Sequence, residues 1–375
     1  MINRSNSLAI LCSGLDDVMR GYETHSRLLF DMFQKDSIRK KNTFLYKRTG
    51  ISTKNQIALN SMSRYSLLFK LLNNIRGDTV YWEYIAFSIK FIIHCIVRQK
   101  SYKKILVIEP MVGKTLMKFK RYLPGTPIIV FTHGVWIEPE DYVNMGDVFH
   151  QPNIENFNKQ KNYFKKNGIK KKSYLIPHFL SEIKVQSVSS DLRNNLHKKY
   201  GIHTKLVLLS VGVINRPHKN MEYLLDEAAK LSEDWTLVLC GEVHEPDLIA
   251  KGIEKMGGRF VHISVDRTEI LNIYKLADVF VLASKQEGFG IVILEAMRAG
   301  LPIILHDREI FRWILNNNEY CVRMDVEDAL SKYISNKQIS DPNWLKSEGK
   351  INMDIYNKKY SWDALKDQYE EMLFE

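Results

Sequence analysis

The sequence is poor in the features that mark disulfide-stabilised and zinc-binding chains. Its four cysteines, Cys12, Cys95, Cys240 and Cys321, lie far apart and form no Cys-x-x-Cys pair. This spacing argues against a zinc site and against a disulfide framework, and it fits a reducing compartment in which the thiols lie in cores. No Asp-x-Asp motif stands out either, so the sequence offers no obvious metal site.

Long apolar runs are also missing. Near the start only Leu8 to Cys12 is continuously apolar, which favours a first buried strand over a signal peptide. The most apolar region, residues 84–97, contains Lys90 and His94 and is shorter than the ~20 residues that span a bilayer. We therefore expect a cytoplasmic, globular protein without a transmembrane helix.

Acidic residues are scarce in the first half of the chain. Residues 1–184 carry 30 Lys and Arg against 14 Asp and Glu, whereas the whole chain has a net charge of +11. Such asymmetry indicates either an anionic partner for the first half or a solubilising surface. The basic and apolar segments 63–76 and 89–104 favour an anionic membrane surface as that partner, unless the helices formed there are buried.

The length of 375 residues and the order of apolar runs predict two doubly wound α/β domains. Strands alternate with helical spacing in both halves, and a polar linker is expected at about 181–204. The predicted domains are residues 1–180 and 181–356, with a last helix at 357–375. Strands are predicted within 7–14, 42–48, 78–84, 103–110, 126–134, 205–212, 235–242, 260–265, 277–284 and 301–307, and helices within 19–33 and 221–231.

Two carboxylates bracket an apolar segment in EGFGIVILE, residues 287–295. The strand predicted at 277–284 precedes it, Gly288 and Gly290 permit a tight turn, and a helix is predicted from Ile291 onward. The first amides of a helix have no intrahelical acceptor and lie at the positive end of its dipole, which suits a phosphate. Carboxylates such as Glu287 and Glu295 accept hydrogen bonds from sugar hydroxyls.

The string from Ser284 to Ile304 resembles the retaining GT-B glycosyltransferases of family 4, which carry an E-x7-E motif. The resemblance implies two Rossmann-like domains facing a cleft, with a C-terminal helix that returns to the first domain. It implies that Glu287 contacts the donor sugar and that Glu295 contacts the ribose. The amides of Gly288, Phe289, Gly290 and Ile291 would then bind the donor.

The resemblance extends to three other segments. Gly14 matches a first glycine-bearing loop near the donor phosphates, and Arg20 and Gly21 start the helix expected at the acceptor. His133 matches a cleft-lining catalytic histidine. Gly212 and Lys219 match a donor-binding glycine and cation, but Val213 stands where the family has an arginine. Arg216 is the candidate substitute, so the expected catalytic residues are Glu287, His133, Lys219 and Arg216.

The resemblance implies a sugar transfer with retention, from a UDP- or GDP-linked donor to a hydroxyl of a glycan or lipid-linked glycan. It implies no cofactor and no metal. The absence of an aromatic and basic RNA-binding motif argues against a nucleic-acid partner, and the basic first half favours a cytoplasmic protein at the inner face of the cytoplasmic membrane. Two alternatives stay open. The fold also carries sugar-nucleotide epimerases and phosphorylases, and the basic first half, with Lys170, Lys171 and Lys172, is compatible with a nucleic-acid-binding protein.

Overall fold

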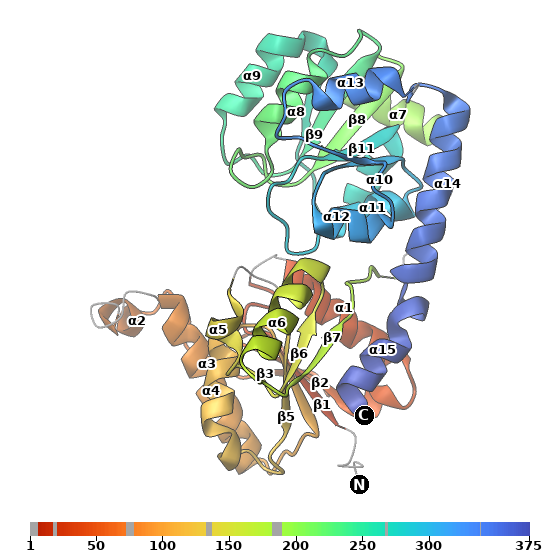
Figure 1. Cartoon of the computed structure of the whole chain (residues 1–375). Helices are drawn as coiled ribbons and strands as arrows, with labels where there is room; N and C mark the ends of the chain where they lie inside the picture. Colours follow the sequence, from red (N-terminus) through yellow and green to blue (C-terminus); the bar gives the residue numbers. More distant parts are fainter. Residues whose placement is uncertain are drawn as a thin grey trace. The chain divides into compact units, whose positions relative to one another are not determined.

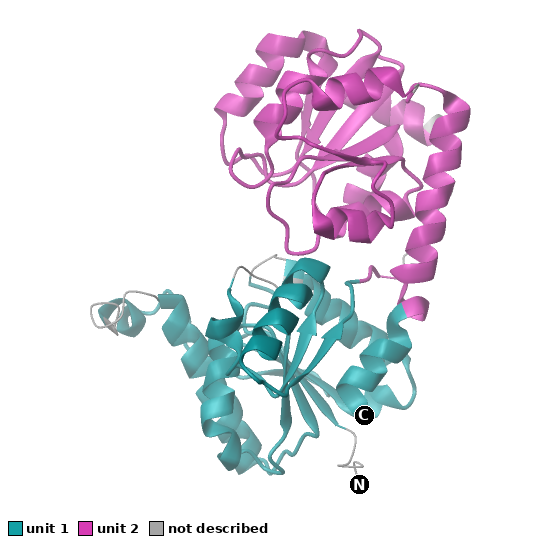
Figure 2. Cartoon of the chain, in the orientation of Figure 1, with its two compact units in different colours: residues 1–178, 365–375 teal, residues 179–364 magenta. Residues whose placement is uncertain are grey.

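The computed structural model describes residues 7–17, 21–72, 79–132, 137–181, 190–266, 269–337 and 339–375. The chain forms two compact units. Figure 2 colours the first unit, residues 1–178 with 365–375, and the second unit, residues 179–364. The second boundary falls inside the C-terminal helix α15 (Trp362–Phe374). The sequence predicts these limits at residues 180 and 356.

The first unit contains a parallel sheet in the order β3-β2-β1-β4-β5-β6-β7 (Figure 1). Its strands are β1 (Leu8–Leu11), β2 (Thr43–Lys47), β3 (Gln56–Ala58), β4 (Lys104–Val107), β5 (Ile128–Thr132), β6 (Val148–Gln151) and β7 (Lys172–Leu175). The order reverses between β1 and β4, which pair in parallel from Leu8 opposite Lys104. Ligands of open α/β sheets bind at the carboxyl ends of the strands where the order reverses.

Helices cover the sheet of the first unit. They are α1 (Gly21–Lys35), η2 (Arg39–Lys41), α2 (Leu67–Leu72), α3 (Thr79–Val97), α4 (Pro110–Phe119), η3 (Lys120–Tyr122), α5 (Pro139–Tyr142) and α6 (Ile154–Lys166). The core between strands and helices includes the fully buried Phe87, Phe91, Ile105, Ile129 and Phe131.

The strand predicted at 78–84 is wrong. Residues Thr79–Val97 form one continuous helix, α3, because Val80 packs against the core and continues the side on which Tyr84, Phe87 and Phe91 are buried. At 19 residues with mean hydropathy 1.4, α3 is long and apolar enough to cross a membrane, which corrects the shorter length expected from the sequence. Such a helix is weak evidence for a membrane span, and one side of α3 packs in the core of the first unit.

The second unit repeats the same topology with the order β10-β9-β8-β11-β12-β13, again all parallel. Its strands are β8 (Leu206–Val211), β9 (Trp235–Cys240), β10 (Phe260–Ile263), β11 (Val279–Leu282), β12 (Ile303–His306) and β13 (Cys321–Val322). Here the order reverses between β8 and β11. The two doubly wound domains predicted from the sequence are therefore confirmed.

Both faces of this second sheet carry apolar side chains, as expected for a parallel sheet between helical layers. The helices are α7 (Ser190–Tyr200), α8 (Met221–Ala228), α9 (Asp247–Met256), η4 (Gly257–Arg259), α10 (Ile270–Leu276), α11 (Ile291–Arg298), α12 (Glu309–Leu315), α13 (Ala329–Asn336) and α14 (Pro342–Lys359). The linker predicted at 181–204 was wrong in part, since α7 occupies much of it.

The C-terminal helix α15 buries one face, on which Trp362, Leu365, Tyr369 and Leu373 are all at most 7% exposed. Its last carbonyl groups accept hydrogen bonds from two lysines that flank or begin β4. Lys104 Nζ donates to Met372 O and Lys103 Nζ to Phe374 O, each at 2.7 Å. Cations at the negative end of the helix dipole hold the end of α15 on the first unit.

Tyr369 contacts a cluster of three buried histidines in the first unit. Its hydroxyl donates to Pro177 O at 2.9 Å and lies 3.2 Å from His25 Nε2. The rings of His25 and His178 lie 4.1 Å apart. His150 Nε2 donates to a backbone carbonyl at 2.7 Å, so its Nδ1 accepts from a threonine hydroxyl. Burial lowers the pKa of His150 to about 4 and of His178 to about 3, and the pKa of His25 lies well below its usual range.

This cluster predicts an acid-labile first unit. Histidines of the unfolded chain titrate near ~6.5, so between that pH and ~4 the unfolded state binds more protons than the folded state. The free energy of unfolding should be highest above that pH range. It should fall by on the order of a few kcal/mol as the pH drops through the range. Calorimetry from pH 7 downward measures the loss.

The exposed His244 of the second unit provides the control for this prediction. A His178→Asn variant should show a shallower loss of stability with falling pH, whereas His244→Asn should match the wild type. Equal slopes in all three proteins would contradict the role of the cluster.

Candidate functional site

Two loops meet at the carboxyl ends of β8 and β11, where the strand order of the second unit reverses. Lys285 N donates to His218 O at 2.9 Å, and His218 Nδ1 lies 2.9 Å from Gln286 Oε1. Asn215 Oδ1 accepts from the amides of His218 at 3.3 Å and Lys219 at 3.0 Å. These bonds fix both loops to each other and set the direction of the Lys219 side chain.

Lys219 and Glu287 form an ion pair between these loops. Their side chains are only 17% and 11% exposed, so the pair is largely shielded from water. The Lys219 stem lies over Gly212, where a Cβ atom would come within 3.1 Å of Lys219 Cε. The structure therefore brings together three of the predicted residues, Gly212, Lys219 and Glu287, at the place where a ligand is expected.

A tight turn leads from Glu287 into helix α11. Gly290 precedes the helix with φ 88°, a backbone conformation that strains residues with a Cβ, so the turn favours glycine here. Phe289 is buried and packs edge-on against Trp313 and Tyr360, which anchors the turn in the core. The first turn of α11 starts at Ile291, and its amides present the positive helix end beside Glu287.

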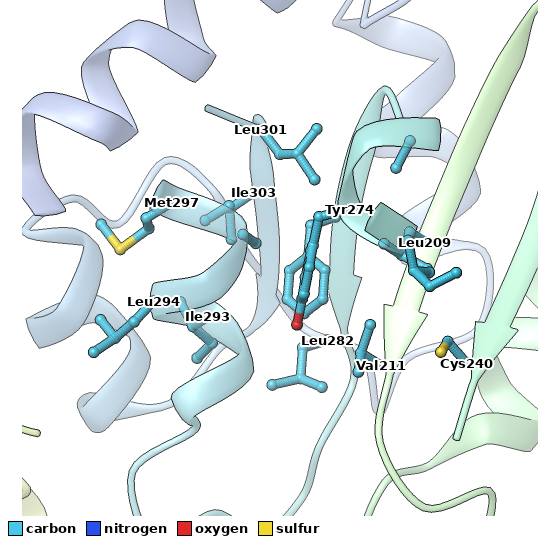
Figure 3. Packing of buried hydrophobic residues seen from close by; sticks show 14 of the residues in the cluster. Leu209, Val211, Cys240, Tyr274, Leu282, Ile293, Leu294, Met297, Leu301 and Ile303 are labelled. Carbon is cyan, nitrogen blue, oxygen red and sulfur yellow. The ribbon is translucent and has the colours of Figure 1, made fainter. Parts of the chain in front are cut away.

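Glu295 lies one turn inside α11 and is 9% exposed. The Tyr274 hydroxyl donates to Glu295 Oε2 at 2.7 Å. Burial and the nearby carboxylate raise the pKa of Tyr274 well above its usual range, so the phenol keeps its proton. Burial, and then Glu295, raise the pKa of Cys240 to about 12. Figure 3 shows the Tyr274 ring between α11 and β8, among Leu209, Ile293 and other apolar side chains. Tyr274 thus orients the Glu295 carboxylate.

Helix α14 supports α11 from outside. Its Gly349 approaches the backbone of Gly300 so closely that a Cβ at 349 would lie 1.9 Å from Gly300 O. Asn352 Nδ2 donates to Leu301 O at 2.9 Å. These contacts lock the chain that follows α11, and with it the orientation of the helix start.

The side chain of Arg216 does not point to the place expected for a ligand of the donor diphosphate. Its guanidinium pairs with Glu222 at 2.9 Å and with Glu245 and Asp247, each at 2.5 Å. These three carboxylates raise the pKa of Arg216 above its usual range and neutralise its charge. The geometry therefore argues against Arg216 as a diphosphate ligand. It shapes the loop after β8, and Lys219 is the better placed cation.

The predicted residues of the first unit are in part described. Gly14 lies in the turn after β1, where Ser13 N and Oγ donate to Glu109 Oε1 at 2.7 and 2.9 Å. Burial raises the pKa of Glu109. Gly21 begins α1. Arg20 and His133 lie outside the described residues, and their acceptor and catalytic roles stay predictions.

Sequence reasoning missed Asn215, Tyr274 and Glu109. Asn215 stands in INRPHKN, where an asparagine ahead of Pro217 signals a loop in which the side chain accepts backbone amides. Tyr274 lies on α10, and no spacing rule links it to Glu295. In the described parts of the chain no group of three His, Cys, Asp or Glu side chains could hold a metal ion. The expectation that no metal or cofactor is needed stays a prediction.

The fold defines the class of the second unit: a doubly wound domain of the kind found in GT-B glycosyltransferases, with Lys219 and Glu287 at its switch point. Residues 193–350 match the sequence model of one family, described as "Glycosyl transferases group 1". This part of the chain is thus similar to that family. The family resemblance predicted from residues 284–304 is confirmed, whereas the E-x7-E motif itself stays untested.

Two curated relatives match about half of this chain. One is the uncharacterized glycosyltransferase MJ1607 of Methanocaldococcus jannaschii, 28% identical over 195 residues, which are 48% of this chain and 47% of the relative. The other is the O-antigen chain mannosyltransferase RfbU of Salmonella typhimurium, 24% identical over 183 residues, or 42% of this chain and 52% of RfbU. The chain thus spans about half the length of these relatives.

The solved structure of Anabaena Alr3699/HepE, in complex with UDP and glucose, is similar over nearly the whole chain. It has a TM-score of 0.72 and 14% identity, and the match covers 98% of this chain and 99% of HepE. At this identity the likeness shows the fold alone. The GT-B fold predicted from the sequence is confirmed.

Proposed function

We propose that this protein is a glycosyltransferase that moves a sugar from a nucleoside diphosphate donor to a hydroxyl acceptor, with retention of anomeric configuration. The observation that carries the proposal is the shielded pair of Lys219 and Glu287 beside the start of α11, at the switch point of the second sheet. This site offers a cation and helix amides for phosphates and a carboxylate for hydroxyl groups, which together suit a sugar nucleotide.

Each group has a distinct task in this proposal. The amides at the start of α11 and the ammonium of Lys219 stabilise the charge that develops on the leaving diphosphate. Glu287 accepts hydrogen bonds from hydroxyls of the transferred sugar. Glu295, oriented by Tyr274, accepts from the vicinal hydroxyls of the ribose. Lys219 and Glu287 pair with each other in the absence of donor. Donor binding therefore replaces this ion pair by a contact of Lys219 with phosphate and a contact of Glu287 with the sugar.

Retention follows in this proposal from reaction on one face of the sugar. The leaving phosphate takes the proton of the acceptor hydroxyl as the new bond forms, so no enzyme carboxylate serves as a covalent nucleophile. His133 is the proposed residue of the first unit near the transferred sugar. Contacts to the diphosphate that are stronger in the transition state than in the ground state lower the activation barrier of sugar transfer.

The proposed acceptor is a lipid-linked oligosaccharide used for a cell-surface polysaccharide. The relative RfbU is named for O-antigen chain synthesis, which supports this class of acceptor. The excess of basic residues in the first half supports a location at the inner face of the cytoplasmic membrane, where anionic lipids attract such a surface.

Product analysis with a panel of labelled UDP- and GDP-sugars and membrane-extracted acceptors tests the proposal. We expect one sugar to enter the lipid-soluble fraction with its anomeric configuration unchanged. Conversion of the free nucleotide sugar without transfer would favour an epimerase, and phosphate-dependent sugar release would favour a phosphorylase. Tight binding of nucleic acid without turnover of any donor would favour the binding protein instead.

A further inference from the structure

The outward side of α3 is apolar, which reverses the usual pattern of a surface helix. Its inward residues, among them Tyr84, Phe87 and Phe91, are buried in the core of the first unit. On the outward side the side chains of Ile93 and Val97 are 53% and 71% exposed. Only 39% of the most apolar window of α3 is buried, so the helix is not simply a core helix.

Helix α2 extends this apolar surface. The two helices contact each other, and Figure 1 shows them at one end of the first unit. Leu67 is 78% exposed, while Phe69 on the opposite side is buried and holds α2 in place. We define the α2–α3 face by its exposed apolar residues: Tyr65, Leu67, Leu68, Leu71, Ile89, Ile93, Ile96 and Val97. On α3 the spacing of Ile89, Ile93, Ile96 and Val97 places them along one side of the helix, and monomeric proteins seldom expose a contiguous apolar surface.

The exposed charges of the segments that form the α2–α3 face are of one sign. Across the described residues 61–72 and 79–100, the acidic side chain is Glu83, and it is buried. Glu83 binds Arg64 Nη2 at 2.6 Å and Arg48 Nε at 3.6 Å, so it does not offset the exposed charges. The remaining basic residues beside the face are Lys70, Lys90, Arg98 and Lys100.

We infer that the α2–α3 face docks on an anionic lipid bilayer, with its aliphatic side chains among the acyl chains and its lysines and arginines at the phosphate groups. The inference deepens the membrane location given in the proposed function. A second copy of the chain fits this face less well, because it would bring a basic rim against an identical basic rim. The buried side of α3 packs on the sheet, so the helix lies on the membrane and does not span it.

The docking helices are tied to the strand ends of the first unit. Glu83 of α3 pairs with Arg48, which directly follows β2, and Arg48 pairs with Asp17 in the turn after β1. Asp16 of the same turn pairs with Lys47 at 2.6 Å. Docking through α2 and α3 therefore holds the turn after β1, which contains Gly14, at a fixed distance from the bilayer surface.

Flotation with phospholipid vesicles tests the inference without any turnover. The apolar variant replaces Leu67, Leu71, Ile93 and Val97 by serine. Its matched control replaces four exposed apolar residues elsewhere by serine: Ile51, Ile253, Val326 and Ile351. A charge variant carries Lys70→Gln and Arg98→Gln, and its control carries Lys358→Gln and Lys359→Gln on α14.

We expect the wild type to float with phosphatidylcholine vesicles that contain phosphatidylglycerol, and less so at high salt. The apolar variant should bind about tenfold or more weakly. The charge variant should lose roughly fivefold per charge. Both controls should float like the wild type, and all variants should keep the wild-type circular dichroism and affinity for nucleoside diphosphate.

Three results would overturn the inference. The first is absence of wild-type flotation at low salt. The second is equal flotation of the apolar variant and its control. The third is a combination of two observations: no form of the protein floats, and sedimentation equilibrium shows a dimer for the wild type but a monomer for the apolar variant. That combination would assign the face to a second copy. Because vesicle binding is measured without donor or acceptor, failure of the proposed sugar transfer leaves this test unaffected.

Discussion

Replacing Lys219 by methionine should lower sugar transfer roughly 10²–10³-fold, the loss typical of removing one group that stabilises developing negative charge. Methionine keeps the stem that lies over Gly212 and removes only the ammonium. The affinity for nucleoside diphosphate should fall with the transfer rate, because the cation contacts phosphate in the ground state and more strongly in the transition state. Calorimetric titration with the nucleoside diphosphate and with the free nucleoside tests whether the ammonium acts on the phosphates. Compared with the wild type, the variant should bind only the diphosphate more weakly.

Stability must be separated from function in this experiment. Removing one partner of a shielded ion pair leaves Glu287 uncompensated, which should lower the free energy of unfolding by about 3 kcal/mol. The double variant Lys219→Met with Glu287→Gln should recover most of that stability and none of the activity. Lys205, an exposed lysine just before β8, gives the control Lys205→Met, which should behave like the wild type. Recovery of transfer in the double variant would refute the role of the ammonium.

Sequence patterns were sufficient for most of the parallel sheet in each unit, because buried strands such as β4 and β8 are short continuous apolar runs. They failed at or next to the sheet edges and in one aromatic segment. The strands β3, β6, β7 and β13 contain lysine, histidine, glutamine or serine, or consist of only two residues, so periodicity did not reveal them. Residues 79–83 have high strand propensity, but Val80 packs against the core and Glu83 is buried, so this segment forms the first turn of α3.

The candidate site shows the same division. Glu287 and Gly290 stand out in a strand–turn–helix pattern that is local in the sequence. Lys219 was named only through the family resemblance, by its spacing after Gly212, and the roles of all three stay predictions. The pairing of Lys219 with Glu287 joins residues 68 positions apart, and only the β8–β11 neighbour relationship brings them together. The neutralisation of Arg216 by Glu222, Glu245 and Asp247 likewise depends on α8 and α9 being adjacent. The sequence shows where a cationic residue stands, but only the fold shows which carboxylate it pairs with.

Replacing Glu287 by glutamine should have the opposite effect on nucleotide binding from the Lys219 variant. Loss of the carboxylate frees the Lys219 ammonium from its ion pair and removes a negative charge beside the phosphates. The affinity for nucleoside diphosphate should therefore stay unchanged or rise, whereas transfer should fall roughly 10²–10³-fold. An alanine at this position should lose transfer to the same or a larger extent, because it also removes the hydrogen-bonding group for the sugar hydroxyls.

The control for this variant is Glu242→Gln, which changes an exposed carboxylate just after the neighbouring strand β9. It should alter neither transfer nor nucleotide affinity. If Glu287→Gln lowered nucleotide affinity and transfer in parallel, the carboxylate would act on the nucleotide and not on the sugar. If it kept near-normal transfer of a confirmed sugar, the site would lie elsewhere. If the variant binds the nucleotide normally but no longer transfers sugar, Glu287 acts on the transferred sugar. The neighbouring Lys219 then acts on the diphosphate.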